Sequence, residues 1–116
     1  MIGIHTEDPH GLVDKINDAI KIGRIVTWSV DVDGDYTHNL DQWKEKAWLR
    51  CVYDEADNSL LRFVIIEPKM QKLTKAIYAV YHSRFAEMLL THFDIEIKDL
   101  FITPLLTPQY DIYSRE

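Results

Sequence analysis

Four polar residues in the segment from residue 69 to residue 93 could carry out chemistry together. Tyr78, Tyr81, Arg84 and His92 recur at intervals that place them on or beside one face of an α-helix. A guanidinium group can hold a carboxylate through two parallel hydrogen bonds, and an imidazole can accept or donate a proton near neutral pH. The spacing therefore indicates one candidate site, a pocket between this helix and a sheet.

The same side chains also have an ordinary structural explanation. A buried tyrosine or histidine needs a hydrogen-bond partner, because leaving such a group unpaired costs about 1–3 kcal/mol. His92 lies near the expected end of the helix, where the helix dipole favours an imidazolium. Arg84 could pair with a carboxylate such as Glu87 or Asp54. Both explanations stay open at this point.

A second set of polar and aromatic residues lies in the loop that follows the first expected strand. Its members are Asp31, Asp33, Asp35, Tyr36, His38 and Trp43. The aspartate spacing matches the start of an EF-hand calcium loop, but the glycine is displaced and a glutamine stands where the closing glutamate is needed. An exposed acidic loop can instead attract a protein partner with a basic surface. The competing explanation is attraction within the chain, to Lys69, Lys72 and Lys75 at the start of the long helix.

Other familiar arrangements for catalysis or cofactor binding are missing from the sequence. The 4 glycines are scattered at positions 3, 11, 23 and 34, so there is no glycine-rich phosphate loop. Cys51 has no second cysteine to pair with, which excludes an internal disulfide. His5 and His10 lack the spacing of a metal-binding pair on one helix. We therefore expect no catalytic motif, no cofactor and no metal.

Length and charge limit the class of protein. The 116 residues include 13 basic and 19 acidic ones, for a net charge of −6 with neutral histidines. That balance disfavours nucleic acid and anionic membranes as partners, since both need a basic footprint. No apolar run approaches the roughly 20 residues of a membrane-spanning helix, and the N-terminal residues lack the apolar core of a signal peptide. We expect one domain, residues 1–116, in the cytoplasm.

Local signals place most of the secondary structure. Asp8 suits an N-cap, Pro9 the first helical position and Gly23 a stop, so we expect a helix over residues 9–22. Alternating apolar residues predict strands over residues 24–32 and 44–54, and a run that is apolar on both faces except at Arg62 predicts a third over residues 60–67. Pro68 ends the third strand because it cannot donate to a ladder, and the long helix follows.

The tail from residue 94 to 116 is apolar but contains Pro104 and Pro108, which indicates an edge strand or an extended segment over the body. The predicted fold is therefore α+β, a three-stranded antiparallel meander with two helices in the order α-β-β-β-α, with the tail as an optional fourth strand. One sheet face should pack against the long helix. The other, around Trp48 and Val64, is apolar enough that the first helix, the tail or a second copy in a homodimer should cover it.

These features favour, as the first hypothesis, a small soluble acidic protein-binding module of the inhibitor, immunity or adaptor type. Its partner would contact the acidic loop and the aromatic residues beside it. The alternative hypothesis is an enzyme or small-ligand binder that uses the pocket lined by Tyr78, Tyr81, Arg84 and His92.

Overall fold

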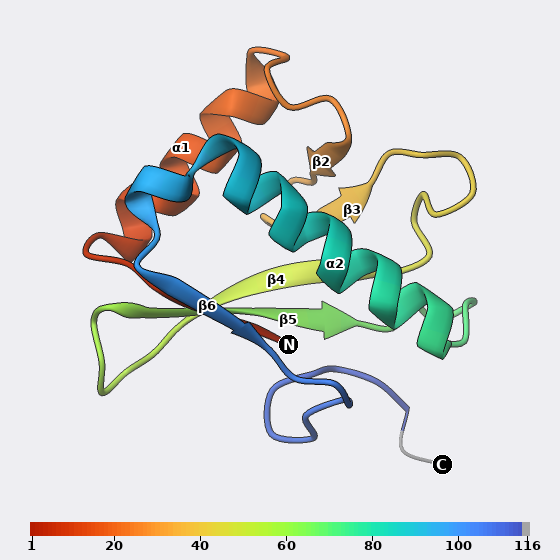
Figure 1. Ribbon diagram of the computed structural model, residues 1–116. Coiled ribbons are helices and arrows are strands. Elements are labelled where there is room, and N and C mark those ends of the chain that lie inside the picture. The colour runs from red at the N-terminus through yellow and green to blue at the C-terminus, as the bar shows by residue number, and fades with distance from the viewer. Residues whose placement is uncertain (115–116) are drawn as a thin grey trace.

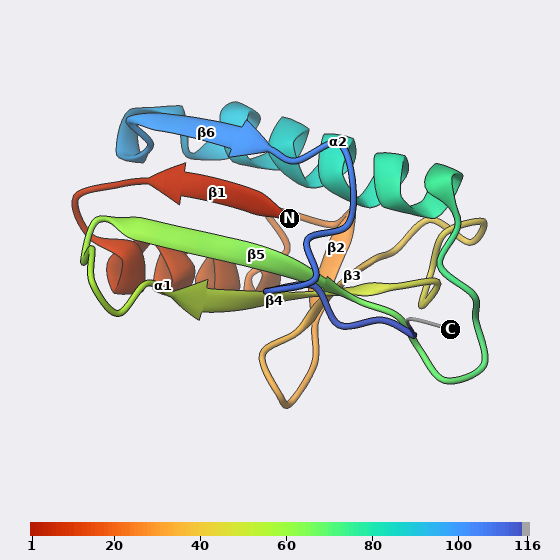
Figure 2. The same cartoon turned by 90° about the horizontal axis from the view of Figure 1, so that it is seen from below.

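The chain forms two layers, in which one antiparallel sheet carries both helices on the same face (Figure 1, Figure 2). The computed structural model describes residues 1–114. Its elements are β1 (Ile2–His5), α1 (Pro9–Lys21), β2 (Trp28–Val30), β3 (Tyr36–His38), β4 (Trp48–Tyr53), β5 (Leu60–Ile66), α2 (Lys75–His92), the short 3-10 helix η1 (Asp94–Glu96) and β6 (Asp99–Ile102). The strands lie in the order β2-β3-β4-β5-β1-β6. Within the described residues, no helix is both long and apolar enough to cross a membrane.

The predicted fold is wrong in the number of strands and in their order. The chain begins with a strand, not a helix, and its six-stranded sheet gives the order β-α-β-β-β-β-α-β. The strand β1 forms because it lies between β5 and β6 and pairs with both, while its own four residues are too few to show a period. The strand β3 lies in a segment whose polar composition indicates a loop.

Helix α1 lies where the sequence predicts it and ends one residue earlier. The Asp8 carboxylate accepts a hydrogen bond from the Gly11 N–H at 3.0 Å, which satisfies one of the free donors of the first turn. Leu12 and Ile16 are buried in the core. The chain leaves the helix at Gly23, whose φ of +80° is a left-handed conformation that glycine adopts without strain.

Helix α2 begins at Lys75, later than the periodic segment suggests. The Thr74 side chain caps it by accepting the Ile77 N–H at 3.2 Å. The preceding residues are held outside the helix, because the Glu67 carboxylate accepts the backbone N–H of Leu73 at 2.7 Å. The start of α2 is therefore set by a cap and by a contact from the end of β5.

An aromatic cluster holds α2 against the inner face of the sheet. The ring centroid of Phe85 lies 4.9 Å from that of Trp28, 4.7 Å from that of Phe63 and 5.5 Å from that of Tyr36. Edge-to-face and tilted pairs of this kind contribute about 0.5–1.5 kcal/mol each beyond the burial of their area. All four side chains are at most 1% exposed. One helix is thereby joined to β2, β3 and β5.

The outer face of the sheet is covered in part by the C-terminal segment, one of the three covers that the sequence left open. The Arg62 guanidinium lies over the Tyr110 ring, 4.4 Å from its centroid. Ile112 pairs with Ile66 beside β5, beyond Ile2 at the start of β1. Trp48 is half-buried on this face, and a homodimer through its surroundings stays a prediction.

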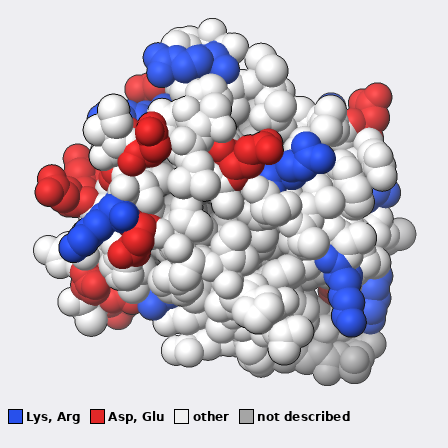
Figure 3. Space-filling view, in the orientation of Figure 1, with Lys and Arg blue, Asp and Glu red and all other residues white. Residues whose placement is uncertain are grey.

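Charged side chains are spread unevenly over the molecule. In Figure 3, acidic and basic groups stand side by side on the upper and left parts of the face shown, further basic groups lie at the right, and the lower middle is uncharged. Phe101, on β6, is 41% exposed. Its ring lies across Gly3 on β1, where an added Cβ would come within 2.1 Å of the ring, so the contact requires a glycine.

A buried carboxylate ties the C-terminal segment to the start of β1. Asp111 accepts the backbone N–H groups of Ile65 at 3.0 Å and of Thr107 at 2.6 Å, and its Oδ2 lies 3.5 Å from the Met1 amino group. That amino group also donates to the Tyr78 hydroxyl at 2.8 Å. Asp111 therefore links β1, β5, α2 and the tail at one junction.

His82 is buried on α2 and stacks on the Tyr78 ring with 3.8 Å between ring centroids. Its Nδ1 lies 2.7 Å from the Tyr78 carbonyl oxygen and therefore carries the proton. Its Nε2 has no hydrogen-bond partner among residues 1–114. Burial, followed by the positive charge of the Met1 amino group, lowers the pKa of His82 to about 4.

Replacing Asp111 by alanine should lower the free energy of unfolding by about 3–5 kcal/mol, because the buried amino group and two backbone N–H groups lose their acceptor. Urea denaturation measures the change. Asp18→Ala removes an exposed carboxylate from α1 and serves as the control, with an expected change below about 0.5 kcal/mol. Equal losses in the two variants would contradict the role given to Asp111.

The stability should also depend on pH through His82. Its folded-state pKa of about 4 lies below the reference value of 6.5, so the stabilisation is complete above pH 6.5 and is lost as the pH falls toward 4. Full loss amounts to roughly 3 kcal/mol. Urea denaturation across this range should show a flatter pH dependence for His82→Phe, while the exposed-site control His10→Gln keeps the wild-type slope. The same slope in His82→Phe and wild type would refute this assignment.

Candidate functional site

The acidic loop is a tight turn that uses most of its own carboxylates. Asp31 Oδ1 accepts the backbone N–H groups of Asp33 and Asp35, both at 2.9 Å, and Gly34 takes a φ of +83°. Asp35 is 5% exposed and holds Arg50 through two hydrogen bonds, at 2.9 and 2.8 Å. Carboxylate oxygens of the three aspartates lie within 4.8 Å of one another, but a cation there would compete with Arg50 for Asp35. Asp33 is left exposed.

The aromatic residues expected beside this loop mostly face inward. Tyr36 is fully buried and donates to Asn17 Oδ1 at 2.5 Å, and His38 is 2% exposed. Trp43 packs partly against the core. Binding of a basic protein partner through this loop stays a prediction, and the structure leaves Asp33 and the neighbouring Val32 as the exposed side chains for it.

The two tyrosines of the predicted helix pocket point to different places. The Tyr78 hydroxyl donates to the Thr103 carbonyl oxygen at 2.6 Å, at the junction with the C-terminal segment. The Tyr81 hydroxyl lies 3.0 Å from Thr37 Oγ1 and donates to the backbone carbonyl oxygen of Trp43. Both hydroxyls therefore connect α2 to other elements, and neither lies in a cavity with Arg84 and His92.

Arg84 and His92 do line one cavity, which we call the α2 hollow. It lies between α2 and the β2–β3 pair and has a volume of about 200 Å³. Its lining residues are Thr27, Trp28, His38, Leu40, Arg84, Glu87, Met88, Thr91 and His92. Trp28 and Met88 are buried and form an apolar floor, whereas the two charged residues and His92 are exposed at the rim.

His38 has a defined tautomer in the α2 hollow. Its Nδ1 accepts the backbone N–H of Leu40 at 3.1 Å, so in the neutral ring the proton is on Nε2. Burial lowers the pKa of His38, and the positive charge of Arg84 lowers it further, while the negative charge of Glu87 partly opposes the shift. His38 is therefore a neutral hydrogen-bond donor at physiological pH.

The charged groups of the α2 hollow have no partner within the described chain. The side chains of Arg84 and Glu87 form neither an ion pair nor a hydrogen bond with any of residues 1–114. Asp54, the other expected partner of Arg84, pairs instead with Arg62 at 2.5 Å. The expected Arg84 ion pair is therefore absent from the structure, and opposite charges stand free at the rim of the α2 hollow.

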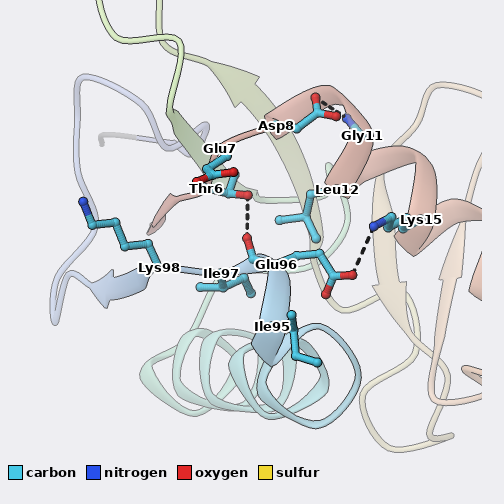
Figure 4. A pocket seen from close by; sticks show the side chains of 10 residues that line it. All are labelled: Thr6, Glu7, Asp8, Gly11, Leu12, Lys15, Ile95, Glu96, Ile97 and Lys98. Atoms are coloured by element: carbon cyan, nitrogen blue, oxygen red, sulfur yellow. Dashed lines mark hydrogen bonds and ion pairs between the residues drawn. The ribbon is translucent and has the colours of Figure 1, made fainter.

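A larger hollow of about 480 Å³ lies between the start of α1 and η1 (Figure 4). Four of its polar side chains already have partners, whereas those of Glu7 and Lys98 form neither an ion pair nor a hydrogen bond among residues 1–114. Thr6 donates to the Glu96 carbonyl oxygen at 2.6 Å, Lys15 pairs with the Glu96 carboxylate at 3.1 Å, and Asp8 caps α1 (Figure 4). The α2 hollow is the better candidate site, because its free charges lie beside a buried histidine and buried apolar side chains.

Sequence reasoning found half of this site. Helical spacing groups Arg84 and His92, which both line the α2 hollow, but it also groups them with Tyr78 and Tyr81, which do not. The ion pair expected between Arg84 and Glu87 is not formed among residues 1–114.

Sequence reasoning assigned His38 to a different surface, because the strand β3 that carries His38 into the α2 hollow was not predicted. The alternation of Trp28 with polar neighbours did identify a buried strand residue, but nothing local to it indicates that its ring would form a cavity floor.

The pKa of His38 should respond in opposite directions to two substitutions on α2. Arg84→Gln removes a positive charge and should raise the pKa, whereas Glu87→Gln removes a negative charge and should lower it. A nuclear magnetic resonance (NMR) titration of the His38 ring measures both, and Lys75→Gln, elsewhere on α2, should leave the value unchanged. Shifts of the same sign in the first two variants would show that these charges do not both face His38.

Comparisons of the chain with models of protein families, with curated proteins and with solved structures found no match. The chemistry of the α2 hollow is thus the ground on which a function can be proposed.

Proposed function

We propose that this chain is a binding domain that holds a small polar molecule in the α2 hollow. One observation carries the proposal: Arg84, Glu87 and the Nε2–H of His38 converge on one cavity without partners among the described residues. Convergent polar groups above an apolar floor are the usual composition of a ligand site.

The volume limits the size of the ligand. The α2 hollow has a volume of about 200 Å³ and is partly open to solvent. Sites for drug-sized molecules are larger, from about 300 Å³ upward. The α2 hollow therefore suits a compact metabolite or a single end group of a larger molecule.

The state of His38 favours binding over acid–base catalysis. A general base needs a free lone pair, but Nδ1 is occupied by the Leu40 N–H and Nε2 carries the proton. Its lowered pKa keeps the ring neutral, so at physiological pH it donates a hydrogen bond without releasing or gaining a proton. This arrangement supports a role in holding a ligand.

Titration with small probes tests the proposal. Acetate, phosphate, methylammonium and glycine should be added separately while backbone amide NMR signals are recorded. At least one probe should shift the Leu40 amide, which reports on His38, together with amides of residues 84–92. Arg84→Gln should weaken binding of an anionic or zwitterionic probe about tenfold, because a charge-assisted hydrogen bond is lost.

Lys75→Gln is the matched control, since it neutralises a basic residue of the same helix outside the α2 hollow. It should keep the wild-type affinity. The proposal fails if no probe shifts the amides around the α2 hollow, or if Arg84→Gln binds every probe as tightly as Lys75→Gln does.

A further inference from the structure

We propose that the α2 hollow selects a small zwitterion, a molecule with a carboxylate and an ammonium group a few bonds apart, as in a free amino acid. The inference rests on the proposed function and names its class of ligand. In this arrangement the carboxylate contacts Arg84 and the Nε2–H of His38, and the ammonium contacts Glu87.

The choice of a zwitterion follows from the two opposite charges at the rim of the α2 hollow. Arg84 and Glu87 are three residues apart on α2, which brings both side chains to one side of the helix and to the same cavity. A purely anionic ligand would satisfy Arg84 but approach the carboxylate of Glu87. A purely cationic ligand would satisfy Glu87 but approach the guanidinium of Arg84. A ligand with both charges satisfies both residues at once.

Contacts within the protein compete only weakly with a ligand for the side chains of Arg84 and Glu87. The two rim side chains form no ion pair with each other in the structure, and an exposed pair at this spacing is a weak interaction in water. Both side chains line the α2 hollow together with His38, so a ligand there can contact both charges. A bound zwitterion therefore has no strong internal ion pair to displace.

His38 gives the carboxylate end a second contact. Its ring is 2% exposed and is held by the Leu40 N–H, so the Nε2–H is fixed in position before a ligand arrives. One charged and one neutral donor match the two oxygens of a carboxylate. The floor made by Trp28 and Met88 suits the short apolar link between the two charged ends.

Two analogues of glycine that each lack one of its charges distinguish a zwitterion from a purely anionic or purely cationic ligand. Propionate has the shape of glycine with a methyl group in place of the ammonium, and ethylamine keeps the amine but lacks the carboxylate. Dissociation constants from amide NMR shifts should show glycine binding at least about tenfold tighter than either compound. In Glu87→Gln the preference of glycine over propionate should disappear, while Lys75→Gln should preserve it.

The possible outcomes distinguish this inference from the proposed function. If propionate binds the α2 hollow as tightly as glycine, or ethylamine does, the zwitterion inference is overturned while small-ligand binding stands. If the preference for glycine persists in Glu87→Gln, the assigned contact is wrong and the inference is overturned as well. If no probe, phosphate and acetate included, shifts the amides of the α2 hollow, both proposals are overturned.

Discussion

The edge-to-face contact between Trp28 and Phe85 positions α2, the helix that carries the charged residues of the α2 hollow. It brings α2 against the β2–β3 end of the sheet, with 4.9 Å between the ring centroids and 88° between their planes. The same indole that packs into the core on one side is the floor of the α2 hollow on the other. Core packing therefore determines where the rim residues of α2 stand relative to His38.

The α2 hollow combines exposed charged groups with one buried polar group, and the two kinds differ in the free energy that they cost the folded state. Arg84 and Glu87 are exposed at the rim, where water solvates them and an unpaired charge costs little. His38 is buried, and its burial is tolerated because the ring is neutral and its Nδ1 has the Leu40 N–H as a donor. His38 is thus held in position by the Leu40 N–H, whereas Arg84 and Glu87 stand unpaired at the rim.

The parts of the fold with local signals could be predicted, and the parts made by distant contacts could not. The cap at Asp8 and the apolar run of β5 are local features of the sequence, so α1 and β5 lie close to where they are expected. The strand β1 has no such signal and exists because β5 and β6 pair with it from both sides. Likewise, the partner of the Tyr78 hydroxyl is 25 residues away at Thr103, beyond what spacing on one helix can indicate. For the site, spacing on α2 identified Arg84, but His38 needed the hairpin that carries it.

A crystal structure of the chain with glycine tests the proposed ligand contacts most directly. We expect the ligand in the α2 hollow, with its carboxylate within hydrogen-bond distance of Arg84 and of His38 Nε2 and its ammonium beside Glu87. An α2 hollow that holds water alone at saturating glycine, or glycine bound elsewhere on the surface, would contradict the proposed contacts.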